Sequence, residues 1–267
     1  MVRVGDTASL SQLLRNVAMG ALVDDLTGSL SGTVAPFSGD AGSLGTGVAG
    51  NGGETQVSFA LDTTNAGIFA GSATLHLASH DSELIDVALD SIDFTLAGTV
   101  NNLADPQFSF NGGDGTFAGS HQLYTLDFGS ISELADTLFS ANLKLMNSAN
   151  GPADDLMGMF DVTGAGVFAL GGFDPLTLSA GDMFGGLSVL FDTSAFGPGA
   201  FAGSVFFHSK SVFAGLNDVD LAPIELRFSG RIVAADVGVP APAALPLLLV
   251  GLLGLLLARR RTGVVVH

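Results

Sequence analysis

The 267-residue sequence contains no cysteine and no tryptophan, and its 20 phenylalanines are accompanied by a single tyrosine. The absence of cysteine excludes disulfides and thiolate metal sites. Tryptophan and tyrosine rings combine a large apolar face with a polar edge, so their near absence counts against a sugar-binding surface that relies on stacking. The chain is instead rich in glycine, with 37 residues.

Basic residues are also scarce. The chain has 9 lysines and arginines against 26 aspartates and glutamates, and three of the nine are Arg259, Arg260 and Arg261. The region before these arginines is therefore strongly acidic. Such a region does not neutralise phosphates, so we expect no nucleic-acid partner. Its acidity is compatible with the binding of divalent cations.

The longest apolar run lies near the C-terminus, from Ala243 to Ala258, and is followed directly by the three arginines. As a helix, its sixteen residues would span about 24 Å, against a bilayer core of about 30 Å. We predict a transmembrane helix at 243–258 and a cytoplasmic basic tail at 259–267. The arginines would act as a membrane stop and leave the acidic body outside the cytoplasm. A buried core helix is the alternative.

The first sixteen residues do not form a secretory signal peptide, which needs an apolar stretch of about 7–15 residues. Arg3, Asp6 and Arg15 interrupt this segment. Export of the body is therefore expected to depend either on residues upstream of Met1 or on the C-terminal tail alone.

A short proline motif precedes the apolar run, at the end of a linker that we place at 234–242. The residues of this proline motif are Val239, Pro240, Pro242 and Ala243. Together with the apolar run and the arginines, it resembles the PEP-CTERM sorting tails, most closely their VPLPA-type branch. The resemblance implies a protein held in the inner membrane of a Gram-negative bacterium and an exosortase-type protease as its partner. It also implies release to the cell surface or extracellular matrix, in association with exopolysaccharide.

The sequence repeats itself at a spacing of about 130 residues. The clearest matches are Asp62-Thr63 with Asp192-Thr193, Phe69-Ala70-Gly71-Ser72 with Phe201-Ala202-Gly203-Ser204, and Ile92–Gly98 with Ile224–Gly230. Repeats at a fixed spacing indicate duplicated structural units. We predict two copies of one domain, at 1–100 and 106–233, joined by a linker at 101–105.

The first copy has no counterpart to residues 106–130, which contain candidate strands at Gln107–Phe110 and Leu123–Phe128. Because Met1 falls inside the repeat, we expect the first domain to lack its first strand. A divergent, shortened first domain is the alternative.

Short segments of both copies alternate apolar and polar residues, which is the pattern of a half-buried strand. They are Ile85–Leu89, Ile92–Leu96, Ser204–Phe207 and Ile224–Phe228. The pattern predicts an all-β fold of two tandem immunoglobulin-like antiparallel β-sandwiches. Leucines near Leu10 have helical spacing, but the matching residues of the second copy alternate, so we predict a strand there as well.

The repeat also resembles the immunoglobulin-like domains of choice-of-anchor D proteins, which are related to the Hydin-like sandwich family. The matching segments are Val4–Ser9, Asp127-Phe128-Gly129, Ser179–Asp182 and Leu226–Gly230. In that family the sandwich is joined to different surface-anchoring tails. The resemblance implies no catalytic residues.

Two glycine-rich segments have the composition of ligand-binding loops. Gly45–Gly50 matches the G-x-G-x-x-G pattern of dinucleotide sites, but no helical pattern follows to receive a pyrophosphate. Asn111–Thr116 has the composition of a calcium loop without the six to eight converging oxygens that calcium needs. We interpret the first segment as a sandwich loop and the second as a turn.

Two pairs of titratable residues recur at equivalent positions of the repeat. Asp24-Asp25 and Asp154-Asp155 could form acid/base or cation sites, or solvated turns. His76 and His208 have no neighbours suited to a metal site or catalytic triad. No nucleophile elbow, zinc-protease motif or phosphate-binding loop is present. We therefore predict a non-enzymatic body with no cofactor and no metal.

The sequence thus favours an exported structural or adhesive protein of the cell envelope. A surface module that binds carbohydrate or divalent cations through the Gly- and Asp-rich loops is the competing hypothesis.

Overall fold

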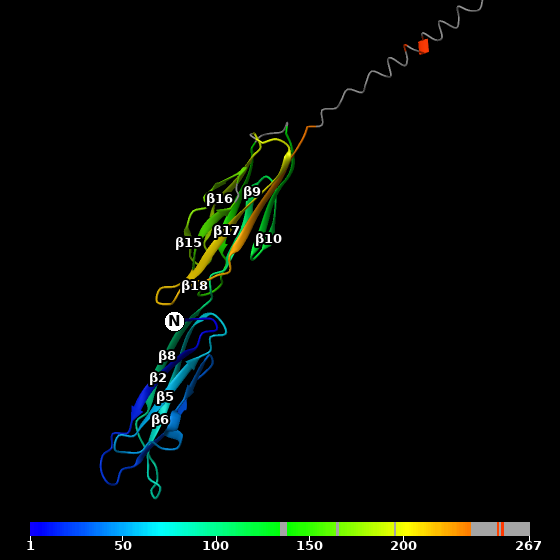
Figure 1. The fold of residues 1–267 in the computed structure, drawn as a ribbon. Coiled ribbons are helices and arrows are strands. Elements are labelled where there is room, and N and C mark those ends of the chain that lie inside the picture. The colour runs from blue at the N-terminus through cyan, green and yellow to red at the C-terminus, as the bar shows by residue number, and fades with distance from the viewer. Residues whose placement is uncertain (134–137, 164–165, 195, 236–249, 251, 254–267) are drawn as a thin grey trace, which may run out of the picture.

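The computed structural model describes residues 1–133, 138–163, 166–194, 196–235, 250 and 252–253. Two elongated β-domains lie end to end, the first at residues 1–101 and the second at 102–235 (Figure 1). The start of the chain lies where the two domains meet. The prediction of an all-β, immunoglobulin-like fold is confirmed.

The first domain contains two sheets packed face to face. Its elements are β1 (Val2–Arg3), β2 (Ala8–Arg15), β3 (Asp25–Ser31), β4 (Phe37–Asp40), the 3-10 turn η1 (Gly42–Gly45), β5 (Glu54–Leu61), β6 (Gly67–His80), β7 (Val87–Ala88) and β8 (Ile92–Asn101). One sheet has the order β1-β8-β6-β3, with β7 paired to β6, and the other has the order β2-β5-β4. The strand predicted around Leu10 is confirmed as β2.

The second domain has the same arrangement with additional strands. Its elements are β9 (Pro106–Gly113), β10 (Thr116–Ser120), β11 (Leu123–Ser132), β12 (Leu138–Asn147), β13 (Asp155–Thr163), β14 (Phe168–Gly171), β15 (Leu176–Leu178), β16 (Met183–Asp192), β17 (Gly199–Val212), β18 (Val219–Asp220) and β19 (Ile224–Val233). Its sheets have the orders β10-β11-β19-β17-β13-β15 and β14-β16-β12-β9, and β18 pairs with β17.

Strand pairings of the first domain recur in the second. Gly67 of β6 pairs with Val100 of β8, and 132 residues later Gly199 of β17 pairs with Ile232 of β19. Strand β1 runs parallel to β8, and β11 runs parallel to β19. Strand β11 pairs with β19 through eight residues, whereas β1 pairs with only the last two residues of β8.

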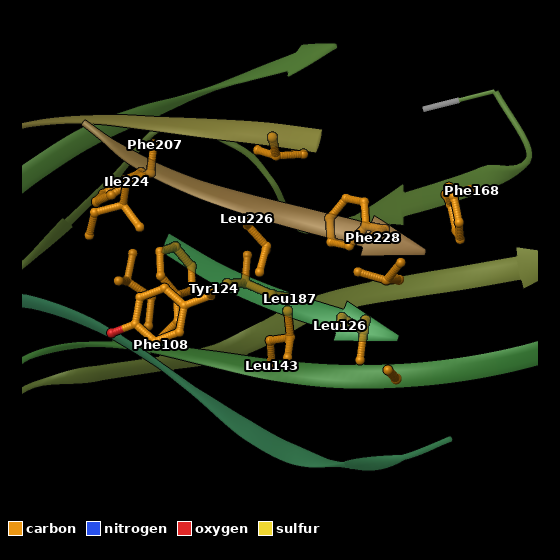
Figure 2. Close-up of a cluster of buried hydrophobic side chains, with 14 of the residues drawn as sticks. Phe108, Tyr124, Leu126, Leu143, Phe168, Leu187, Phe207, Ile224, Leu226 and Phe228 are labelled. Carbon is orange, nitrogen blue, oxygen red and sulfur yellow. The ribbon is translucent and has the colours of Figure 1, made fainter. Parts of the chain in front are cut away.

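The two cores differ in size. The second domain buries a large cluster in which Phe108, Tyr124, Leu143 and Leu226 come from both sheets and point toward one another (Figure 2). The first domain buries a smaller cluster, which consists of Phe37, Leu44, Val48, Val57, Phe59, Ala73, Leu75 and Leu96. Burial of apolar side chains is the main source of folding free energy, so the second domain has more to hold it together.

The predicted transmembrane helix at 243–258 requires correction. Among the residues that the structure describes, no helix is long and apolar enough to cross a membrane. Only Val250, Leu252 and Leu253 of this segment are described, and their side chains are exposed. The apolar run is shorter than the roughly 20 residues that a span usually needs.

Two further predictions concern segments outside the described residues. They are the sorting motif Val239, Pro240, Pro242 and Ala243, and the membrane stop Arg259, Arg260 and Arg261. The predicted strand at Ile85–Leu89 is too long, because only Val87–Ala88 pairs with β6.

Candidate functional site

The junction between the domains contains a fully buried carboxylate, Asp154, which directly precedes β13. Its Oδ2 atom lies 2.5 Å from the Nε atom of Arg3, which comes from β1 of the first domain. The Arg3 side chain is itself almost completely buried. A buried ion pair across the junction therefore connects residues that are 151 positions apart in the sequence.

Three groups donate hydrogen bonds to the Asp154 carboxylate. Besides Arg3, the Ser211 hydroxyl donates to Oδ2 at 2.9 Å, and the Asn101 side-chain amide donates to Oδ1 at 3.1 Å. The Ser211 oxygen accepts the backbone N–H of Ala104 at 2.9 Å. Buried charges are costly unless they are paired and hydrogen-bonded, and these contacts supply both conditions.

Main-chain hydrogen bonds reinforce the same junction. Asn102 donates its N–H to the carbonyl of Pro152 at 2.9 Å and accepts the N–H of Asp154 at 3.0 Å. Arg3 also donates from Nη1 to the carbonyl of Asn217 at 2.6 Å. The predicted linker at 101–105 therefore starts at Asn101, the last residue of β8, and Asn102 is hydrogen-bonded to the second domain. Much of this segment is thus held in place by contacts with the domains.

The equivalent aspartate of the first domain, Asp24, lies in a different environment. Its Oδ2 accepts the hydroxyl of Ser79 at 2.6 Å, as Asp154 accepts that of Ser211. Asp24 is half-buried. It precedes Asp25, which pairs with His80 at the end of β6, whereas the start of β6 pairs with Val100 next to the junction, so Asp24 lies at the far end of the first domain. The repeated aspartates therefore share a serine partner, but Asp154 also pairs with an arginine.

Two interpretations of the aspartate pairs were open: a cation or acid/base site is not assembled, and a solvated turn does not describe Asp154, which is fully buried. Asp25 and Asp155 begin β3 and β13, and each pairs in register with the strand beside it. Within the described ranges, no group of three or more histidine, aspartate or glutamate residues could hold a metal ion.

The two equivalent histidines of the repeat, His76 and His208, lie on exposed faces of their strands. His76 on β6 makes hydrogen bonds with Ser31 at 2.8 Å and Ser91 at 3.2 Å. His208 on β17 stacks against Phe206, with ring centroids 6.3 Å apart. A different histidine, His80, pairs with Asp86 at 2.7 Å. The hydrogen bond and the negative charge of Asp86 raise the pKa of His80 above its ordinary value.

Neither glycine-rich segment forms the ligand loop that its composition suggests. Gly45–Gly50 leaves the end of η1, and Val48 then makes an isolated β-bridge with Leu26, so no helix follows to face a phosphate. In the turn between β9 and β10, the Asp114 carboxylate accepts the backbone N–H of Ser140 at 2.9 Å. Asp114 thus fixes the turn to β12.

The first domain is hollowed along one side. A cavity of about 400 Å³ lies between β8 on one sheet and β2 and β5 on the other. Its walls include Leu10, Phe37, Phe59 and Leu96, so much of its lining is apolar. Sequence reasoning missed this cavity as a site, although the missing counterpart to residues 106–130 was a signal that could have located it.

No protein-family model and no curated protein matches the chain. Among solved structures, it resembles CfaE, the adhesive subunit of the CFA/I fimbria of enterotoxigenic Escherichia coli, at a TM-score of 0.34 and 9% identity. That match covers 84% of this chain and 87% of CfaE. It also resembles the first two extracellular domains of human protocadherin-24, at a TM-score of 0.31 and 16% identity over 79% of this chain and 83% of that one.

A third similar structure is a PapD-like domain of human CEP192, with a TM-score of 0.30, 11% identity and coverage of 50% of this chain and 88% of that chain. The solved structures that resemble this chain thus include adhesin, cadherin and PapD-like domains. These scores do not place the chain in a family, and the junction and the cavity carry the functional argument.

Proposed function

We propose that this chain is a non-catalytic structural or adhesive protein of the cell surface, in which two β-sandwich domains form one rigid rod. The observation that carries the proposal is the buried Arg3–Asp154 pair at the junction. Opening the junction would leave two charges without their partners and would break the hydrogen bonds of Asn101 and Ser211. Removing one partner of a buried pair typically costs about 3–5 kcal/mol, so bending at this point is strongly disfavoured.

Rigidity suits a protein that holds a surface or a partner at a fixed distance. Interfaces between domains of one chain usually permit relative motion unless they are large and apolar. A buried charge pair replaces that apolar interface here, with three hydrogen bonds to the Asp154 carboxylate and one buried Arg3 nitrogen, Nη2, without a hydrogen-bond partner. Its directional contacts also define how the domains are rotated relative to each other.

The sequence supports a location outside the cytoplasm. We propose that Val239, Pro240, Pro242 and Ala243 form a sorting motif that is recognised by an exosortase-type protease, and that the body reaches the cell surface or the surrounding exopolysaccharide. Substituting both prolines with alanine, in a bacterium that encodes such a protease, should leave the full-length chain unprocessed on an immunoblot. Processing that continues at the wild-type rate would contradict this part of the proposal.

The competing function, carbohydrate or cation binding, has less support. The only tyrosine, Tyr124, is buried in the core of the second domain and offers no face to a sugar. A glycan array probed with and without calcium distinguishes the two functions, because a spacer should bind nothing in either condition.

Distance measurement by pulsed electron paramagnetic resonance tests the rod directly. The chain has no cysteine, so spin labels can be attached at Ile68→Cys on β6 and Met159→Cys on β13, both of which are exposed positions. We expect a single narrow distance distribution, which should broaden when Asp154→Asn is added. A broad distribution in the chain with an intact Asp154 would overturn the proposal.

A further inference from the structure

Two methionines and a histidine lie side by side on the outer face of the second domain. Met157 and Met159 are alternate residues of β13, so their side chains project from the same face of this strand. In the antiparallel pairing of β13 with β17, His208 lies directly opposite Met159. Residues opposite each other have Cβ atoms about 4.5–5.5 Å apart, and diagonal neighbours such as Met157 and His208 are about 7–8 Å apart. Both methionine side chains are therefore close enough to meet at the imidazole ring.

These three side chains also line one pocket. The pocket has a volume of about 490 Å³, and its walls come from β13, β15, β17 and the segment around β18. Met157 is 41% exposed and Met159 is 60% exposed, and His208 is exposed as well. Side chains with so much exposed surface contribute little to the core, and an ion can approach them directly from solvent.

The first domain has a histidine at the equivalent position but no methionine beside it. His76 lies opposite Ser29, which is the counterpart of Met159 in the repeat. Thr27 takes the place of Met157. Both neighbours of the histidine carry hydroxyl groups there, so the sulfur atoms beside the imidazole are a feature of the second domain alone.

The two histidines also differ in their polar contacts. The ring of His76 makes hydrogen bonds with the hydroxyl groups of Ser31 and Ser91. The ring of His208 stacks against Phe206, and within the described part of the chain its nitrogen atoms have no hydrogen-bond partner. The imidazole of His208 is therefore available to an ion from solvent, whereas that of His76 is engaged by hydroxyl groups.

The chemistry of the pocket favours a soft cation. Thioether sulfur is a soft ligand that selects monovalent copper, and imidazole also binds copper. Asp218 and Asp220 lie in the wall of the pocket, and the ammonium group of Lys210 beside them is paired with Asp220 at 3.4 Å. An acidic surface attracts cations, whereas calcium and magnesium require oxygen ligands, which the two methionines do not supply.

We propose that Met157, Met159 and His208 bind one monovalent copper ion through the two sulfur atoms and a ring nitrogen. Thioether sulfur and neutral imidazole carry no charge, so the bound ion keeps its single positive charge, which the two aspartates of the pocket wall partly offset. The site lies entirely in the second domain. It depends on neither the junction nor the sorting motif, and its failure would leave the spacer role intact.

Silver(I) is the first probe, because it has the charge and the ligand preference of monovalent copper and is stable in air. The full-length chain, with carbon-13 in its methionine methyl groups, is titrated with silver nitrate in chloride-free buffer and followed by NMR. The methyl signals of Met157 and Met159 should shift and saturate at one equivalent. The signal of Met183, which is 59% exposed on the other sheet, should not move. Anaerobic competition with the copper(I) chelator bicinchoninate then measures the affinity for copper.

Matched variants of the protein locate the site. Met159→Leu removes one sulfur atom with little change in volume, and His208→Ala removes the imidazole. Each should weaken copper binding about tenfold or more, because even a residue that only supports a metal ligand typically contributes that factor. Met183→Leu and His76→Ala change the same residue types outside the pocket, and they should leave the affinity unchanged.

Any of four results would overturn the proposal. The methionine signals could stay unshifted at millimolar silver, or those of both sheets could shift together, which would indicate non-specific binding to exposed thioethers. Met159→Leu and Met183→Leu could have the same affinity for copper. Alternatively, silver could bind while the chain fails to compete with bicinchoninate for copper(I) at any ratio of chain to chelator.

Discussion

The two domains are versions of one fold, and the clearest difference between them is what covers the last strand of the larger sheet. In the second domain, β19 lies between β17 and β11, and its inward side chains are buried. In the first, β8 has β6 on one side and two residues of β1 on the other. The comparison shows that a β-sandwich keeps its strand order when an edge strand is nearly absent, at the cost of core burial and a free edge.

A second difference lies at the ends of the domains. Asp154 and Asp24 occupy equivalent positions and each accepts a serine hydroxyl, but only Asp154 is paired with an arginine from a neighbouring domain. One repeated residue thus has two roles, because the surroundings differ while the local structure is the same.

The largest expected effect comes from removing the charge of Asp154. Asp154→Asn leaves the buried Arg3 guanidinium without a counter-charge, and should lower the free energy of unfolding by up to about 3–5 kcal/mol. Asp24→Asn weakens a hydrogen bond to Ser79 and should cost about 1 kcal/mol. Chemical denaturation followed by circular dichroism measures the free energy of unfolding of both variants. Equal decreases would mean that the ion pair of Asp154 with Arg3 contributes nothing to stability.

Matched isoleucines give the next largest effect. Ile224→Ala should cost about 2–5 kcal/mol because it leaves a cavity in a closed core. Ile92→Ala, at the equivalent position, should cost less than half as much, because Ile92 is already partly exposed to water. Tyr124 is the only tyrosine and tryptophan is absent, so tyrosine fluorescence reports the unfolding of the second domain, and circular dichroism reports both domains.

The control for this pair is a double variant with both substitutions. The isoleucines lie in separate domains, so their effects should be additive. A larger loss from Ile92→Ala than from Ile224→Ala would contradict the account of an uncovered β8.

The smallest effect concerns pH. His80 ends β6 and pairs with Asp86, which raises the pKa of His80. Because the pKa of His80 is higher in the folded state, its pairing with Asp86 stabilises the fold fully at pH values below the pKa of an unfolded histidine, about 6.5. This stabilisation is lost as the pH rises through the pKa of His80 in the folded state. The equivalent residue of the second domain is Val212, so His80→Val should abolish this dependence. NMR titration of the His80 ring should show a midpoint above 6.5, and a midpoint at or below this value would contradict the pairing.

Much of the fold could be predicted from local pattern. The alternation in Ile92–Leu96 and Ile224–Phe228 predicted β8 and β19, because a half-buried strand imposes that period on its sequence. The same alternation at Ile85–Leu89 predicted a strand longer than β7. An alternating pattern indicates only that one face of a strand could be buried. Whether a neighbouring strand is present to bury it is a tertiary property.

The junction could not be predicted in the same way. The recurrence of Asp24 and Asp154 was visible, but the arginine that pairs with Asp154 is 151 residues away in the sequence. Nothing in the local sequence of Arg3 indicates which carboxylate it meets. The transmembrane helix at 243–258 was predicted from the apolar composition of the run, which was given more weight than its length of sixteen residues, fewer than the roughly 20 that a span usually needs.

Amide exchange along β8 and β19 of the full-length chain is the most direct test of the central claim, that the first domain has an open edge where the second is closed. The alternate amides of Glu225–Ser229 that bond to β11 should be protected, and the equivalent amides of Asp93–Ala97 should exchange much faster, because their N–H groups point toward water. Residue-resolved NMR measures both strands in one sample. Equal protection of the two sets of amides would show that the edge of β8 is covered, and it would contradict the account.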